Sequence, residues 1–164
     1  MKQASFTPQE LYNIVAQGKG PDLHWFQEGV SLSHLAATFV AMANTSGGTV
    51  LLGVSPRSGR VQGVHNVVHT RDRIFQAALL ADPPLILPLP VLQKINETQV
   101  LWITIPAGLP NVYSMEGRYM WREGIRNAPM PARRLRQLLL ERGALQFETK
   151  IPPGATMDDL DMSQ

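Results

Sequence analysis

Cysteine is absent from the sequence, and its absence excludes several kinds of chemistry at once. Disulfide bonds, thiolate metal sites and a cysteine nucleophile all require that side chain. Long apolar runs are missing as well, since none approaches the roughly 20 residues that span a membrane as a helix. The first residues also lack the apolar stretch of a signal peptide. We therefore expect a cytoplasmic location and no membrane partner.

Motifs of nucleotide-binding and hydrolytic enzymes are likewise missing. The glycine pair Gly47 and Gly48 follows a helical run instead of opening a helix, and no Gly-Lys-Ser/Thr accompanies it, so it is not a P-loop. No Gly-x-Ser-x-Gly elbow offers a serine nucleophile. His65 and His69 could share a helix face and a metal, but no carboxylate or thiol sits at a supporting spacing. We expect no catalytic residue, no metal and no cofactor.

Charge of either sign is modest, with 15 basic and 13 acidic residues and a net charge of +2. Three of the acids, Asp158, Asp159 and Asp161, lie in the last seven residues, so the chain up to Lys150 carries a net +5. Seven of the arginines fall between Arg118 and Arg142. A body of this charge permits a polyanion as a partner without requiring one.

The length and the apolar content together indicate one folded domain. The 164 residues are 44% apolar, which suffices for a sizeable core. We expect the domain to span residues 1–150. The segment 151–164 has two prolines, a glycine and the acidic patch, so we expect an acidic linker or a disordered tail. Such a linker would lead to a C-terminal effector domain that the sequence does not include.

The segment from Asn44 to Val54 is the centre of the predicted fold. An alanine-rich helical run stops at Asn44, and Gly47 and Gly48 can adopt positive φ, so the chain can turn sharply into a sheet. The strand from Thr49 to Val54 is almost continuously apolar, which is typical of a strand buried on both faces. The glycine backbone would also let a phosphate or another chain approach closely. Both interpretations stay open.

The rest of the chain mixes predicted helices and strands. Thr7-Pro8-Gln9-Glu10 supplies an N-cap, a proline at the first helical position and a capping box, so a helix begins there and ends at Gly18. Further helices are expected from Ser31 or Ser33 to Asn44, from Val67 to Ala81, and from Pro131 to Arg142, where Gly143 follows. Strands are expected at Leu23 to Phe26, Arg60 to Val64, Val91 to Ile95, Gln99 to Ile105, Val112 to Met115 and Arg118 to Arg122, with a loop at Arg126 to Pro129.

Four blocks between about residues 20 and 142 form a recognisable series. They are Ala43-Asn44-Thr45-Ser46-Gly47-Gly48-Thr49 with Leu51-Leu52-Gly53-Val54, then Val61-Gln62-Gly63-Val64, then Ile103-Thr104-Ile105-Pro106 with Asn111-Val112-Tyr113, and finally Tyr119-Met120-Trp121-Arg122-Glu123-Gly124 with Asn127. This series resembles the Schlafen/AlbA-type DNA-binding domain of predicted bacterial transcriptional regulators. The resemblance implies an α/β (α+β) fold in which helices pack on a single mixed β-sheet.

The sequence departs from that family at three positions. Where nuclease members of the Schlafen group would hold a divalent metal with acids, this chain has Lys19, His24 and a residue near Ser55. A Mg²⁺ or Mn²⁺ site for phosphodiester cleavage needs several carboxylate oxygens. Only Asp22 and Glu28 remain nearby, and their spacing is different. The departure therefore favours a binding protein over a nuclease.

Arginines are the best candidates for a functional surface. The predicted phosphate contacts are Arg57, Arg60, Arg118, Arg122 and Arg126, together with the backbone N–H groups of Gly47 and Gly48. The even spacing of Arg118 and Arg122 would place both on one face of a strand. Tyr113, Tyr119 and Trp121 lie between them as candidate stacking surfaces. The alternative for these arginines is a solvated face with no ligand.

We expect a nucleic-acid-binding module, the DNA-binding part of a predicted transcriptional regulator, which contacts the phosphate backbone with little sequence preference. RNA is the other polyanion that this charge permits. A different class of function is an assembly module, in which an edge strand such as Val91 to Ile95 pairs across a homodimer. A residual metal-dependent nuclease is the third alternative.

Overall fold

The computed structural model describes residues 7–150, with side chains as far as Gly143, so the expected tail at 151–164 lies outside the described residues. The elements in chain order are α1 (Pro8–Gln17), β1 (Leu23–Phe26), α2 (Leu32–Ala43), β2 (Gly48–Leu52), α3 (Val67–Leu79), β3 (Val91–Ile95), β4 (Thr98–Ile105), β5 (Met120–Glu123), β6 (Arg126–Pro129) and α4 (Ala132–Lys150). None of the helices within residues 7–150 is long and apolar enough to cross a membrane.

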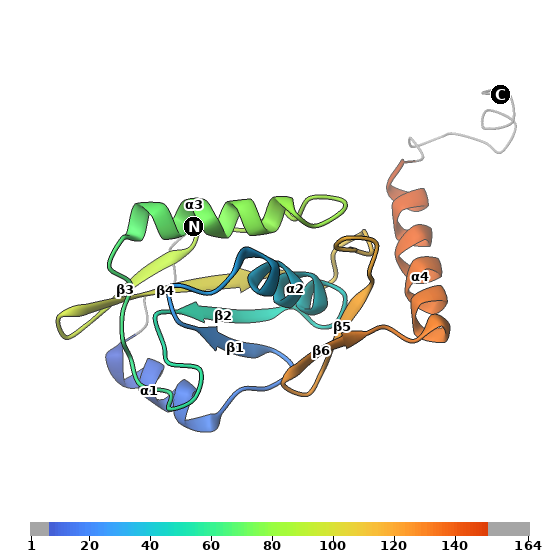
Figure 1. Ribbon diagram of the computed structural model, residues 1–164. Coiled ribbons are helices and arrows are strands. Elements are labelled where there is room, and N and C mark those ends of the chain that lie inside the picture. Colours follow the sequence, from blue (N-terminus) through green and yellow to red (C-terminus); the bar gives the residue numbers. More distant parts are fainter. Residues whose placement is uncertain (1–6, 151–164) are drawn as a thin grey trace, which may run out of the picture.

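The main sheet has four strands in the order β1-β2-β4-β3. β1 runs parallel to β2, and the other two pairings are antiparallel, so the sheet is mixed as expected. β5 and β6 form a separate two-stranded antiparallel hairpin beside the end of α2 (Figure 1). The predicted fold of helices packed on a mixed sheet is confirmed, with this hairpin as an addition.

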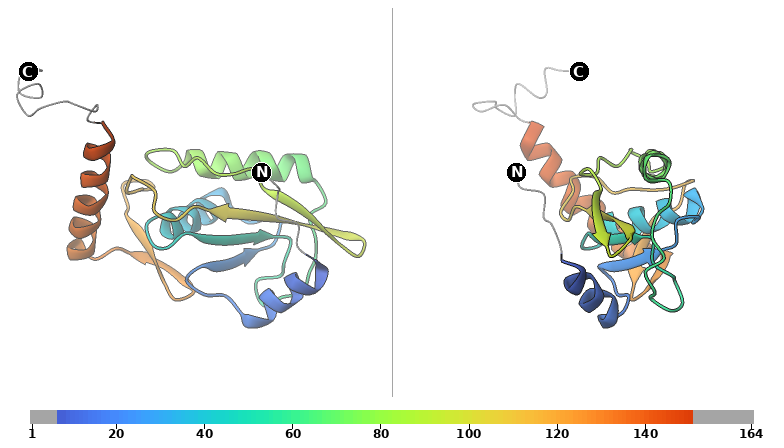
Figure 2. Two further views of the ribbon diagram at one scale, coloured as in Figure 1. Left: turned by 180° about the vertical axis from the view of Figure 1, so that it is seen from behind. Right: turned by 90° about the vertical axis from the view of Figure 1, so that its left-hand side faces the viewer.

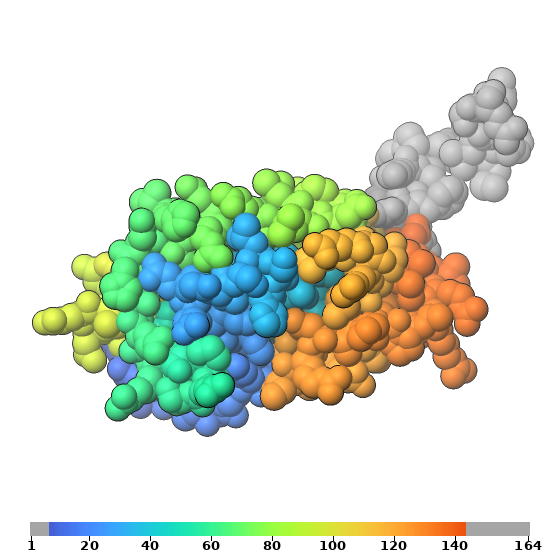
Figure 3. All heavy atoms as spheres, viewed as in Figure 1, coloured from blue at the N-terminus to red at the C-terminus, as the bar shows by residue number. Residues whose placement is uncertain are grey.

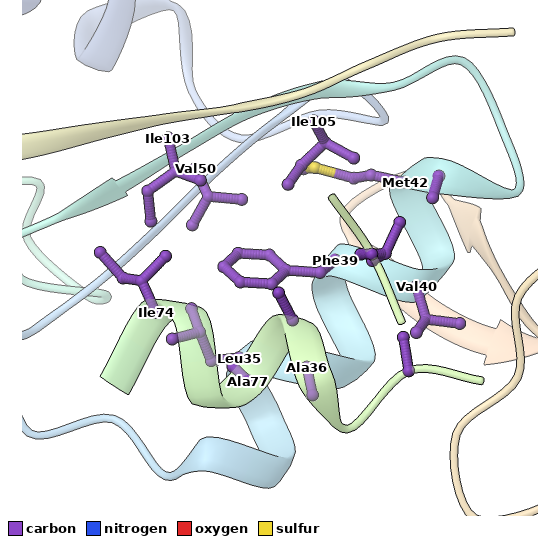
Figure 4. Packing of buried hydrophobic residues seen from close by; sticks show 14 of the residues in the cluster. Leu35, Ala36, Phe39, Val40, Met42, Val50, Ile74, Ala77, Ile103 and Ile105 are labelled. Atoms are coloured by element: carbon purple, nitrogen blue, oxygen red, sulfur yellow. The ribbon is translucent and has the colours of Figure 1, made fainter. Parts of the chain in front are cut away.

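Both α2 and α3 cover one face of the main sheet (Figure 2). Phe39 of α2 lies between Ile74 of α3 and the sheet residues Val50 and Ile103, and all four side chains are fully buried (Figure 4). Eight of the twelve residues of α2 are buried, because the helix is enclosed by the sheet, by α3 and by the β5–β6 hairpin. This burial explains why the helix is rich in alanine, which allows the neighbouring elements to approach closely.

α1 packs on the opposite face of the sheet. Thr7 accepts a hydrogen bond from the N–H of Glu10, and the Glu10 carboxylate accepts one from Thr7, so the predicted capping box is confirmed. Leu11 is fully buried in a second cluster with Trp25 and Trp102. The two faces of the sheet therefore have separate cores.

Four sequence-based expectations are wrong. The expected strand at Val112 to Met115 is absent, because those residues form only isolated bridges, from Ser114 to Asp82 and from Met115 to Arg118. The expected strand at Arg60 to Val64 is reduced to a single bridge between Val54 and Val61, because the chain turns at Gly63 to pass over Gly53. The expected loop at Arg126 to Pro129 is β6, which pairs with β5. Gly143 does not stop the last helix, since α4 continues to Lys150.

Candidate functional site

Asn44 joins the end of α2 to the chain that enters the β5–β6 hairpin. Its Nδ2 donates to the carbonyl oxygens of Tyr113 and Met120, each at 2.8 Å, and its Oδ1 accepts from the Tyr113 N–H at 2.8 Å. Next to it, the Thr45 hydroxyl oxygen accepts from the Arg122 N–H at 3.0 Å. The helix end at Asn44 therefore serves as a connection point for residues about 70 positions later in the chain.

Gly47 and Gly48 are crowded by backbone from two other segments. A Cβ on Gly47 would lie 2.5 Å from the Ile105 carbonyl oxygen, and one on Gly48 would lie 2.6 Å from the Asp22 carbonyl oxygen. The Gly47 N–H donates to the Met42 carbonyl oxygen at 2.8 Å. The close approach that glycine permits is therefore used by the protein's own chain. The Gly47 N–H is engaged inside the fold and is not offered to a phosphate.

Arg122 is also engaged inside the fold, which corrects its expected place on an exposed face with Arg118. The residue is only 4% exposed. Its Nη1 donates to the Asn127 Oδ1 at 2.8 Å and its Nη2 to the Gly20 carbonyl oxygen at 2.7 Å. Asn127 in turn donates to the Thr38 hydroxyl at 2.9 Å. Arg122 thus fixes the hairpin to α2 and to the start of β1.

Two adjoining recesses share His24, Phe26 and His34, and we refer to them together as the cleft. The first lies between β1, the outer side of α2 and the hairpin, and the second continues from β1 and the start of α2 toward Lys19 and Pro56. Their volumes are about 380 and 510 Å³. The first is lined by His24, Phe26, His34, Ala37, Thr38, Met120, Ile125, Arg126 and Asn127, and the second by Lys19, His24, Phe26, Gln27, Gly29, Val30, Ser31, His34 and Pro56. The space-filling view shows a hollow between the blue segment with α2 and the orange hairpin (Figure 3). No Asp or Glu among the described residues lines either of these recesses, whereas Arg126 lines the first and Lys19 lines the second.

His24 lies where the two recesses meet. Burial, followed by the neighbouring charges of Lys19, Arg122 and His34, lowers the pKa of His24 to about 3. Arg122 Nη2 lies 3.3 Å from His24 Nδ1, and because a guanidinium can only donate, Nδ1 is the acceptor. The ring is therefore neutral near pH 7 and carries its proton on Nε2.

Lys19 lies at the other end of the cleft. Its ammonium group donates to the Pro56 carbonyl oxygen at 3.2 Å and sits 5.4 Å from the centre of the Trp25 ring. Burial, and to a smaller extent the charge of Arg122, lower the pKa of Lys19. The Trp25 Nε1 donates to the Ser55 carbonyl oxygen at 3.1 Å. Lys19 and the Ser55 carbonyl group therefore both contact the Trp25 side chain, which follows His24 in β1.

Glu28 is not placed to hold a metal with these residues. Glu28 is turned toward the N-terminus of α3, where its carboxylate accepts from the N–H groups of His65 and Asn66 and from the Thr70 hydroxyl. His65 precedes that helix, so it does not share a helix face with His69. Within the described residues, no three His, Cys, Asp or Glu side chains form a group that could hold a metal ion.

The remaining predicted arginines are exposed but scattered. Arg126 lines the cleft, and Arg57 follows Pro56 at its far end. Arg60 borders a separate recess beside Tyr12. Arg118 lies in a turn bridged to Met115, ahead of β5. Of the predicted set, only Arg126 and Arg57 are therefore associated with the cleft.

The aromatic residues expected as stacking surfaces are mostly inside the protein. Tyr113 is part of the core on the α2 side, and the Trp121 Nε1 is enclosed without a partner. The rings that line the cleft are instead those of His24, Phe26 and His34, which sequence reasoning did not combine. The alternation of His24 and Phe26 on one strand was the available signal, because alternate residues of a strand point to the same face.

Comparison with known proteins identifies the family. The family model described as Schlafen, AlbA_2 matches residues 23–131, which is more than half of the chain. The chain belongs to the Schlafen, AlbA_2 family. The matched range includes β1 to β6, the connection at Asn44 and most of the cleft. No curated protein matches the sequence of this family member.

Two solved structures share the fold of this Schlafen, AlbA_2 domain. One is the N-terminal domain of a protein from Nitrosomonas europaea described as related to the ATP-dependent DNA helicase RecG, with a TM-score of 0.59, 16% identity, and coverage of 79% of this chain and 94% of that domain. The other is the DIP2311 protein from Corynebacterium diphtheriae, with a TM-score of 0.56, 19% identity and coverage of 74% of this chain. The match spans only 24% of the DIP2311 chain.

Proposed function

We propose that this domain binds nucleic acid through phosphate contacts in and around the cleft. The observation that carries the proposal is the lining of the cleft, where the cations Lys19 and Arg126 and the imidazoles of His24 and His34 occur without any carboxylate. A concave site with charge of one sign concentrates ligands of the opposite sign. The neutral His24 adds an N–H donor, which a phosphate oxygen accepts well.

The arginines outside the cleft extend this positive surface. Arg57 lies beside the Lys19 end, and Arg60 and Arg118 are exposed further away. Contacts of this kind hold the backbone and do not read bases, so affinity is expected to be weak, salt-dependent and nearly independent of sequence. We propose DNA as the ligand and a transcriptional regulator as the larger setting. The family resemblance and the likeness to a domain from a RecG-related protein support that choice.

We propose binding without cleavage. Lys19, His24 and Ser55 supply no carboxylate oxygens where a metal-dependent nuclease needs them, and Glu28 is engaged at α3. Incubating the protein with structured RNA and Mn²⁺ tests this part of the proposal. The RNA should remain intact at protein concentrations that saturate binding, and cleavage that is lost on adding a chelator would contradict the proposal.

The binding itself is tested by titrating a labelled DNA duplex at two salt concentrations. We expect a dissociation constant of about 10⁻⁶ to 10⁻⁴ M near physiological salt, and much tighter binding at low salt. Charge-reversed variants Lys19→Glu and Arg126→Glu should weaken binding strongly, whereas Arg133→Glu on α4 serves as the matched control. Absence of binding even at low salt would overturn the proposed function.

A second candidate function is self-association, and the position of β3 favours it. β3 is one of the two edge strands of the main sheet, and a recess lined by Arg71 and Leu89 to Leu92 lies between it and α3. On α3, Val68, Phe75 and Leu79 are exposed at spacings that place them on one helix face, with Arg71 and Asp72 between them. Two copies related by a two-fold axis could pair Arg71 with Asp72 while Val68 meets Phe75.

Light scattering of the purified protein distinguishes this candidate. A dimer that Phe75→Asp converts to a monomer would support association through α3 and β3. A monomer at all accessible concentrations would remove the candidate and leave the nucleic-acid proposal unaffected.

A further inference from the structure

We propose that the cleft takes an unpaired nucleobase, so that the domain prefers single-stranded nucleic acid to a duplex. This inference rests on the proposed function and specifies the form of ligand that the same site accepts. It is carried by the aromatic and apolar part of the lining, which phosphate binding does not use.

One wall of the cleft is a row of three rings from β1 and α2. The centroids of His24 and Phe26 are 4.7 Å apart, and those of Phe26 and His34 are 6.1 Å apart. All three side chains line both recesses. The rings are tilted to one another, by 56° between His24 and Phe26 and by 40° between Phe26 and His34. A base would therefore stack on one ring, and the exposed ring is that of His34, since Phe26 is buried. Stacking tolerates any base because every base has a π-face.

The opposite side of the cleft is formed by the hairpin. Ile125, at the turn between β5 and β6, is 56% exposed, and Met120 stands at the start of β5. Exposing an isoleucine to water at a hairpin turn is unfavourable for the fold. The same side chain would cover a base placed against the rings, and its apolar surface would then be buried. Arg122 holds this hairpin to β1 and α2, so the two sides face each other in a fixed geometry.

Polar groups at the edges of the cleft complete the match to a nucleotide. The Asn127 amide is oriented by its bonds to Arg122 and Thr38, and its Nδ2 keeps a second hydrogen for a base edge. Lys19 and Arg126 lie at opposite ends, where the phosphates on either side of an inserted base would pass. An aromatic and apolar middle between two cations is the composition expected for a base with its neighbouring phosphates.

A duplex cannot use this arrangement, because its bases are already stacked on one another. Taking a base out of a duplex requires unstacking and unpairing, whereas an unpaired base is available at once. The duplex can still reach Lys19 and the exposed arginines through its phosphates. Single-stranded and double-stranded ligands should therefore share the salt-dependent contacts and differ by the contribution of the inserted base.

The decisive comparison uses three labelled oligonucleotides measured by fluorescence anisotropy at one low salt concentration. They are a single strand of roughly 12 nucleotides, the same strand with abasic sites throughout, and the corresponding duplex. The abasic strand keeps the phosphates and removes the bases, so it isolates stacking from charge. We expect the single strand to bind about five- to 150-fold more tightly than the abasic strand, which is the range for one stacked base.

Two pairs of matched variants locate the effect. His34→Ala and Ile125→Ala should reduce the single-strand affinity toward the abasic level, whereas His69→Ala and Ile86→Ala, which change exposed residues of the same types elsewhere, should not. All four positions are on the surface, so the variants should fold. Equal affinity for the single, abasic and double strands would overturn the inference but leave the proposed function standing. No binding to any of the three would overturn both.

Discussion

The side chain of Asn44 and the backbone of Tyr113 form a reciprocal pair of hydrogen bonds, both 2.8 Å long, across 69 residues of sequence. The Asn44 amide imitates a neighbouring strand, since it donates to the Tyr113 carbonyl and accepts from the Tyr113 N–H. Its second donor hydrogen is used by the Met120 carbonyl. Asn44 is buried, so water does not reach this site to replace the hydrogen bonds that its amide makes with these backbone groups.

Replacing Asn44 with alanine should destabilise the domain by about 3 kcal/mol, because buried backbone groups lose their partner. Urea unfolding followed by tryptophan fluorescence measures this change. Asn13→Ala, on the exposed side of α1, is the control and should shift stability by no more than about 0.5 kcal/mol. A small effect of Asn44→Ala would mean that water or a rearranged chain replaces the amide.

Gly47→Ala should be far more harmful than Gly108→Ala, although the two glycines have φ angles of 68° and 67°. Both substitutions place a residue with a Cβ in the left-handed conformation, which costs about 1 kcal/mol of stability. At Gly47 the added Cβ also meets the Ile105 carbonyl oxygen, whereas nothing lies within 4 Å at Gly108. We expect a total cost of about 3 kcal/mol or failure to fold at Gly47. Thermal unfolding of the two variants side by side gives the comparison, and equal losses would contradict the packing argument.

Glu28 should make stability depend on acid pH. Desolvation acts to raise the pKa of Glu28, but hydrogen bonds from the N–H groups of His65 and Asn66 and from the side chains of His65 and Thr70 outweigh it and lower the pKa to about 2. A carboxyl group whose pKa is lower in the folded state stabilises the fold above its unfolded pKa. That stabilisation is lost as the pH falls through the folded value.

Thermal melts from pH 7 down to pH 2 test this dependence. Glu28→Gln should be less stable than the wild type at pH 7, and the two proteins should converge as the pH falls from about 5 toward 2. Glu97→Gln, in the exposed turn before β4, is the control and should follow the wild-type curve. A constant difference between Glu28→Gln and the wild type at all pH values would show that charge is not the cause.

Arg126→Ala should weaken nucleic-acid binding without changing stability, because Arg126 is exposed and lines the cleft. Loss of one phosphate contact should reduce the slope of log affinity against log salt by about 1. Arg122→Ala should instead lower the free energy of unfolding by about 3 kcal/mol, since a buried guanidinium with several partners is removed. Binding titrations at several salt concentrations, paired with urea unfolding, separate the two effects. The opposite assignment would mean that Arg122 faces the ligand.

Local signals of the sequence were sufficient for most elements. The capping box at Thr7, the strand at Leu23–Phe26 and the helix before Asn44 depend on neighbouring residues, and the structure has them where the pattern indicates. β6 could not be predicted this way, because Arg126–Pro129 has no apolar alternation and becomes a strand only by pairing with β5. The predicted end of α4 relied on Gly143 as a stop. The helix continues through it, because a single glycine destabilises a helix by only about 1 kcal/mol.

The sequence by itself determined the family and the mixed sheet with its helices. Only the tertiary structure decided which polar residues face solvent. Arg122 and Arg126 are both arginines of one hairpin, yet one is buried and one lines the cleft. Hydrogen bonds to Gly20 and Asn127 make that difference, and they depend on segments that meet only after folding.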